Sequence, residues 1–195
     1  MKTLKTLALA TAVSAGLLGS GAIAAATPGV DGLLGATSEG SFDINLDIKG
    51  QIIIKGLESV DFSAPLGKGD LIGGTQHCVS TNSVGGKYAI TASSDNADGN
   101  KFRLMSPDAA DFVEYNVYYS VGKLATSTIP GSKATLKSGE TNDNGAAGFV
   151  SNDSTLACND DNATVFVEIP EANVKTATSQ IGAWTDTLTL LVAPI

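Results

Sequence analysis

Apolar and polar residues alternate without a break from Phe42 to Lys49. Successive side chains of a β-strand point to opposite faces, so this period of two predicts a strand with one buried face and one face in water. The same phase resumes after Gly50 at Ile52 and Ile54, which predicts a second strand or a continuation of the first. The apolar side chains of the first run are Phe42, Ile44, Leu46 and Ile48.

Short β-favouring runs separated by turn-forming clusters fill the rest of the chain, and no helical period competes with them. Several strands at this spacing predict an all-β, Ig-like sandwich of two antiparallel sheets, with a closed barrel as the alternative. The predicted strands cover residues 59–62, 86–92, 101–105, 113–119, 164–169 and 185–192, and the turn signals include Gly73-Gly74, Gly85-Gly86 and residues 95–100, 139–145 and 159–162.

The N-terminus has the features of a secretory signal peptide. Lys2 and Lys5 precede an uncharged run that ends in small residues suited to cleavage after Ala24 or Ala26. A transmembrane anchor is the alternative, but an A-x-A site follows the run, and no later stretch is long and apolar enough to span a bilayer. We therefore expect residues 1–26 to be removed and residues 27–40 to form a flexible leader. About 170 residues then remain for one domain.

The charge balance argues against a nucleic-acid partner. Twelve Lys and Arg against 20 Asp and Glu give a formal net charge of −8. Proteins that bind nucleic acid neutralise phosphates with clustered cationic side chains, and this composition does not supply them.

Cys78 and Cys158 are the two cysteines of the chain. Export into an oxidising compartment predicts that they form a disulfide, which would stabilise the fold by roughly 4 to 5 kcal/mol in the chain-entropy model. The alternative is a reactive Cys78 thiol activated by the adjacent His77. Neighbours in a strand point to opposite faces, so this adjacency argues against contact between the two side chains.

Other candidate sites have a functional and a structural interpretation. The acidic runs 95–100 and 159–162 offer oxygen ligands for Ca²⁺, but Asp and Asn also dominate ordinary turns, and turn chemistry is favoured. Asp186 is a candidate acid or base without a visible second catalytic group. Tyr115, Tyr118 and Tyr119 offer an aromatic platform for a sugar, although packing explains them at least as well. We expect no catalytic activity, no metal and no cofactor.

The last predicted strand places Leu188, Leu190 and Val192 on one face, and three residues follow it in the sequence. We therefore expect an Ig-type sandwich with an uncovered hydrophobic edge, which natural proteins normally cover. The alternating run that begins at Phe42 is suited to fill such an edge in its own or a neighbouring chain. Burial of its four apolar side chains would contribute roughly 6 to 12 kcal/mol before ordering costs. An ordinary first strand of a complete sandwich is the alternative.

Four stretches together resemble the spore coat protein U-like subunits of archaic chaperone-usher pili. The resemblance covers about residues 40–194. It is carried by residues 40–48, by Cys78 ahead of the strand 88–91, by residues 102–105 followed by 113–118, and by residues 182–190, where Trp184 stands at a position usually occupied by Tyr.

This resemblance implies an incomplete Ig-like pilin domain, residues 50–195, that lacks its final strand. A periplasmic chaperone would hold the subunit until an outer-membrane usher exchanges it for a neighbouring subunit, whose N-terminal donor strand, residues 41–49, completes the fold. Phe42, Ile44, Leu46 and Ile48 would be the donor side chains, and Leu188, Leu190 and Val192 would line part of the acceptor groove. The expected product is a non-covalent surface fimbrium that supports attachment or biofilm formation. The alternative is a monomeric secreted module that binds carbohydrate or Ca²⁺.

Overall fold

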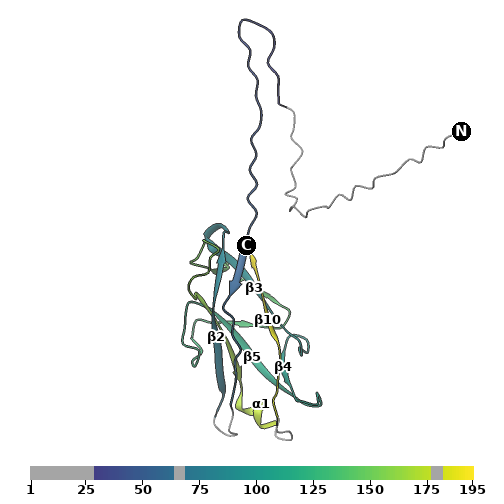
Figure 1. The fold of residues 1–195 in the computed structure, drawn as a ribbon. Coiled ribbons are helices and arrows are strands. Elements are labelled where there is room, and N and C mark those ends of the chain that lie inside the picture. Colours follow the sequence, from purple (N-terminus) through teal and green to yellow (C-terminus); the bar gives the residue numbers. More distant parts are fainter. Residues whose placement is uncertain (1–28, 64–68, 177–181) are drawn as a thin grey trace, which may run out of the picture. The chain divides into compact units, whose positions relative to one another are not determined.

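The computed structural model describes residues 29–63, 69–176 and 182–195. The chain divides after Asp47 into an N-terminal segment and a larger unit, Ile48–Ile195, which contains the sheets (Figure 1). The predicted signal peptide, residues 1–26, lies outside the described residues, as do the first two residues of the predicted leader. No helix in the described part of the chain is long and apolar enough to cross a membrane.

The larger unit consists of two antiparallel β-sheets. The first has the order β1–β2–β9–β5–β4, with β6 also paired to β5, and the second has the order β10–β3–β7, with β8 also paired to β3. This confirms the predicted all-β fold, and the described strands form two separate sheets rather than one closed barrel. The elements are β1 (Ile52–Lys55), β2 (Leu71–Thr81), η1 (Val84–Gly86), β3 (Lys87–Ser94), β4 (Phe102–Met105), β5 (Phe112–Val121), β6 (Ala134–Leu136), β7 (Thr141–Asn142), β8 (Phe149–Val150), β9 (Ala163–Ile169), α1 (Glu171–Thr176) and β10 (Leu188–Pro194).

The core lies between the two sheets and is built from alternating positions. On β5, Val113, Tyr115, Val117 and Tyr119 are buried. The residues that lie between these positions, the last of which is Tyr118, are more exposed. They pack in one cluster with residues of the other sheet, such as Ile90 of β3. The strand predicted at residues 113–119 is therefore formed, and its alternating burial places one face in the core.

Strand β2 differs from the prediction, because Gly73-Gly74 lies within this strand and not in a turn. A Cβ atom on Gly73 would lie 2.7 Å from Cγ1 of Val60, and a Cβ atom on Gly74 would lie 2.5 Å from the carbonyl oxygen of Val165. The two glycines therefore allow neighbouring segments to approach the strand closely. The predicted strand at residues 59–62 is wrong, since this segment is neither strand nor helix and packs against β2.

The short helix α1 was also not predicted. It follows Pro170, whose carbonyl oxygen accepts hydrogen bonds from the backbone N–H groups of Asn173 and Val174 at 2.9 and 3.2 Å. Glu171 and Lys175 form an ion pair at 3.0 Å one helical turn apart. A helix of six residues is too short to show a helical period in the sequence.

The N-terminal segment is described from residue 29 onward and has little regular structure. Val30 and Ser41 exchange two backbone hydrogen bonds of 2.8 and 3.0 Å, which join the predicted leader to the first residue of the predicted donor strand. Residues 42–48, named here the alternating segment, are neither strand nor helix, so the strand predicted from their pattern is not formed. A strand needs a partner for its backbone hydrogen bonds. The exposed fractions of Phe42, Ile44, Leu46 and Ile48 are 76%, 84%, 83% and 74%.

Candidate functional site

The edge strand β10 is the part of the larger unit that the sequence marked as a site. It pairs with β3 along its whole length, from Leu188 opposite Ser94 to Pro194 opposite Tyr88. On its other side it has no strand partner among the described residues. Leu190 is buried in the core and Leu188 and Val192 are half-buried against it, so these three side chains share the inner face as predicted.

Strand β1 is the edge strand of the other sheet and lies against β10. Within the described ranges its one strand partner is β2, and its residues Ile52 and Ile54 are half-buried against the core. Two edge strands therefore meet here with their apolar side chains partly uncovered. We call the line between β1 and β10 the open seam. The sequence indicated its β10 side; Ile52 and Ile54 of β1 were recognised as strand residues but not as part of a site.

Asp186 anchors the start of β10. Its carboxylate accepts hydrogen bonds from the hydroxyls of Ser94 and Tyr115, both at 2.5 Å, and from the backbone N–H and side-chain amide of Asn96 at 3.2 and 3.1 Å. Burial, together with the hydrogen bond to Asp186 and its negative charge, raises the pKa of Tyr115 above its ordinary range. Since donors from three segments satisfy this carboxylate, it holds the strand in place and is not arranged as a general acid or base.

The three tyrosines proposed as a sugar platform do not share a surface. Tyr115 and Tyr119 point into the core, whereas the Tyr118 side chain is directed to the other face of the sheet. The Tyr118 hydroxyl donates a hydrogen bond to Glu168 at 2.7 Å, and the Lys133 ammonium lies 4.2 Å from its ring centroid. Strand alternation thus separates the tyrosines, and the platform interpretation is wrong.

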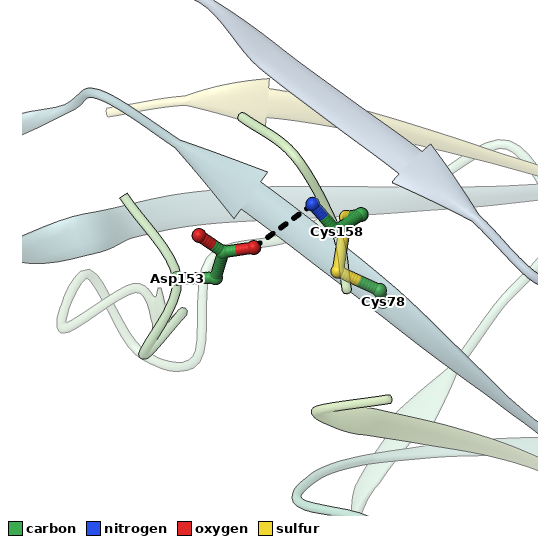
Figure 2. Close-up of side chains that lie close together, drawn as sticks. All are labelled: Cys78, Asp153 and Cys158. Carbon is green, nitrogen blue, oxygen red and sulfur yellow. Dashed lines mark hydrogen bonds between the residues drawn. A yellow bond between two sulfur atoms is a disulfide. The ribbon is translucent and has the colours of Figure 1, made fainter. Parts of the chain in front are cut away.

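Cys78 and Cys158 form the predicted disulfide, with their Cα atoms 5.6 Å apart (Figure 2). The bond joins β2 to the loop that precedes β9. The backbone N–H of Cys158 also donates a hydrogen bond of 3.0 Å to the carboxylate of Asp153. Because the Cys78 sulfur is covalently bonded, it is not a thiol nucleophile in this state, and the two sulfurs with Asp153 are not a set of free metal ligands.

A hollow of about 300 Å³ lies beside the disulfide and contains the predicted acidic turn. It is lined by Asn152, Asp153, Thr155, Asn159, Asp160 and Asn162. The side-chain amide of Asn162 is engaged by the backbone of Val79, with both hydrogen bonds at 2.8 Å, and Asp161 pairs with Lys123 at 3.0 Å. In the other acidic run, Asp98 pairs with Arg103 and Asn96 binds Asp186. Both runs therefore carry turn and packing contacts, as favoured from the sequence.

His77 is fully buried on β2, and its Nε2 atom lies 3.3 Å from the hydroxyl of Tyr119. That hydroxyl in turn lies 2.8 Å from the hydroxyl of Tyr88, so a chain of three polar side chains crosses the core. Burial lowers the pKa of His77 to about 4, because the charged imidazolium would lose its hydration. The group is therefore a neutral core histidine at physiological pH, and it is not placed to activate Cys78.

Comparison with known proteins found distant similarity to solved structures and to nothing else. No family model matches the chain, and no curated protein sequence matches it. A chain from a chaperone–tip adhesin complex, described as vital for the synergistic activation of CFA/I fimbriae biogenesis, is similar with a TM-score of 0.47 and 18% identity. The match covers 74% of the present chain and 41% of the other chain. Similarity of this size carries no information about activity or partners.

Proposed function

We propose that this protein is a structural pilus subunit that polymerises by donor-strand exchange, as its sequence resemblance to spore coat protein U-like subunits implies. One observation carries the proposal: the chain has both an exposed alternating apolar segment and an open seam with an unpaired apolar strand edge. Each feature is a liability alone, since exposed apolar strands and free edges promote association. Together they are complementary surfaces for two copies of the same chain.

The two surfaces match in length and chemistry. The alternating segment, residues 42–48, has the same length as β10, which has seven residues. Inserted beside β10, it would place its four apolar side chains against the half-buried residues of β1 and β10 and its polar side chains toward water. At about 1.5 to 3 kcal/mol for each side chain, burial would contribute roughly 6 to 12 kcal/mol before ladder hydrogen bonds and ordering costs.

The assembly route in this proposal is the one that the resemblance implies. A subunit with an open seam needs a temporary cover until the next subunit arrives, and a periplasmic chaperone followed by an outer-membrane usher would supply and then remove that cover. The disulfide suits an oxidising compartment. In this proposal the protein passes through the periplasm and ends in a cell-surface fimbrium that supports attachment or biofilm formation, and it has no catalytic role.

The proposal is tested on surface-sheared material from the native cells. The sample is run on a denaturing gel with and without boiling and detected by immunoblot. A non-covalent polymer of high kinetic stability gives a ladder at multiples of the subunit mass that collapses to one band on heating. A single monomer band in both lanes would contradict the proposal and favour a monomeric secreted binding module.

Two matched substitutions test the role of the alternating segment. Ile44→Asp places a carboxylate on its apolar face, and Asn45→Asp places the same charge on its polar face. Burial of an unpaired charge is strongly unfavourable, so Ile44→Asp should abolish the ladder and Asn45→Asp should retain it. Equal ladders from both variants would show that the apolar face is not buried in the polymer.

A further inference from the structure

The three residues between the alternating segment and β1 are bound at both ends by the side chain of Asn82. This linker is Lys49, Gly50 and Gln51, and Asn82 lies beside it at the end of β2. The Asn82 amide accepts a hydrogen bond from the backbone N–H of Gln51 at 2.5 Å and donates one to the carbonyl oxygen of Lys49 at 3.0 Å. One amide group thus binds both ends of the linker.

Further bonds extend this contact into the sheet. The carbonyl oxygen of Gln51 accepts hydrogen bonds from the backbone N–H of Asn82 at 3.1 Å and from the Thr81 hydroxyl at 2.9 Å. The next residue, Ile52, already pairs with Thr81 in the β1–β2 ladder. The hydrogen bonds of Asn82 therefore continue the β1–β2 pairing through the linker, from Gln51 back to Lys49.

These bonds require an extended linker. In an extended chain, the carbonyl group of one residue and the N–H group two residues later point to the same side, and one amide can bind both. A chain that reverses direction instead needs a turn with non-extended central residues. Gly50 also lies against Pro194 at the end of β10, where a Cβ atom would be 3.3 Å from the proline ring.

Reversal at this linker is the step that self-insertion would need. To lie along the open seam of its own chain, the alternating segment would have to turn back at residues 49–51 and run beside β1. A segment tethered by so short a linker has an effective concentration in the millimolar range, far above the concentration of a second chain. Without a structural obstacle, a subunit of this design would fill its own seam and would not polymerise.

We propose that Asn82 is this obstacle: it holds the linker extended and so directs the alternating segment to a second copy of the chain. This inference rests on the proposed function and adds to it how the partner is chosen. Asn82 acts through contacts with the linker backbone of its own chain, and in this mechanism it does not contact the donor strand of the second copy. Its removal should therefore shift the balance between self-inserted monomer and polymer without changing the acceptor site.

The test uses the full mature chain, refolded by dilution with the disulfide intact, and separates monomer from polymer by size-exclusion chromatography. Loss of two side-chain hydrogen bonds in Asn82→Ala should raise the ratio of monomer to polymer by about five- to tenfold. Asn116→Ala is the matched control, because it removes an exposed amide that bonds to Glu168 at 3.0 Å on another part of the sheet. This control should give the same ratio of monomer to polymer as the parent chain.

A second measurement shows whether the acceptor site survives the substitution. A fluorescent peptide of residues 41–49 is titrated into full chains that carry Ile44→Asp, whose own segment is disabled, with and without Asn82→Ala. Equal peptide affinity together with a raised monomer fraction supports the inference. Equal partition of Asn82→Ala and Asn116→Ala overturns it, as does loss of peptide binding in Asn82→Ala. The proposed function itself fails if two results occur together: the parent chain does not polymerise, and the Ile44→Asp chain does not bind the peptide.

Discussion

Acidification should destabilise this protein through one residue, His77. Its ring is fully buried beside Tyr119, and burial lowers its pKa from 6.5 to about 4, with weaker opposite effects from a backbone hydrogen bond with Thr75 and from the charge of Asp161. In the unfolded chain the imidazole is hydrated and takes up a proton near its ordinary pKa. The unfolded state therefore gains protons at a pH at which the folded state does not.

The size of the effect follows from this difference. The contribution of neutral His77 to the free energy of unfolding is fully present above pH 6.5. It decreases as the pH falls toward 4, because in this interval the unfolded state binds a proton that the folded state does not. A pKa difference of one corresponds to about 1.4 kcal/mol, so the full loss is about 3 kcal/mol and the loss at pH 5 is about 2 kcal/mol. Such a loss is a large part of the stability of a single domain.

The assay is urea unfolding at pH 8 and pH 5, followed by the fluorescence of Trp184 with the disulfide intact. The His77→Gln variant has no titrating group at this position, while all carboxylates remain. The free energy of unfolding should decrease by about 2 kcal/mol more in the parent chain than in His77→Gln between these pH values. An equal decrease in both proteins would refute the reasoning, because the pH dependence would then arise from other groups.

Three further substitutions test other contacts. The double variant Cys78→Ser with Cys158→Ser should lose roughly 4 to 5 kcal/mol of stability in urea unfolding, and reduction of the parent chain should give the same value. Tyr115→Phe removes a donor from Asp186 and should cost about 1 to 3 kcal/mol, whereas Tyr118→Phe, on the other face, should cost less. Gly74→Ala should lower the melting temperature, because its Cβ would lie 2.5 Å from a backbone oxygen; an unchanged value would mean that β9 moves freely.

Sequence patterns predicted the strands that have one wet face. Strand β5 alternates between buried and exposed positions along most of its length, and β10 alternates along its whole length, so their periodicity shows both the strand and its inner side. Strand β2 escaped detection because residues from His77 to Thr81 are buried on both faces, where the loop around Asp153 covers the outer side. Its glycine pair was interpreted as a turn, because close packing and turns both favour the smallest residue.

The candidate site could be predicted only in part. The inner face of β10 was readable from the positions of Leu188, Leu190 and Val192, and the disulfide from the two cysteines. The anchoring of Asp186 was not, because its partner Tyr115 is 71 residues away in the sequence. The contact between β1 and β10 was not predictable either. It depends on how the two sheets pack against each other, and the alternation of residues within one strand carries no information about that packing.

The disulfide also bears on the speed of folding. Strand β2 pairs with β9 between residues far apart in the chain, from Leu71 opposite Ile169 to His77 opposite Ala163. Contacts of such large sequence separation form slowly, because the intervening chain must lose entropy before the ladder repays it. The disulfide spans 80 residues, and it joins Cys78 on β2, next to the end of this ladder, to Cys158 in the loop shortly before β9. If the disulfide forms early, it brings β2 and β9 close together, so their pairing no longer requires closure of the long loop. The unpaired strand edges are then exposed to other unfolded chains for a shorter time.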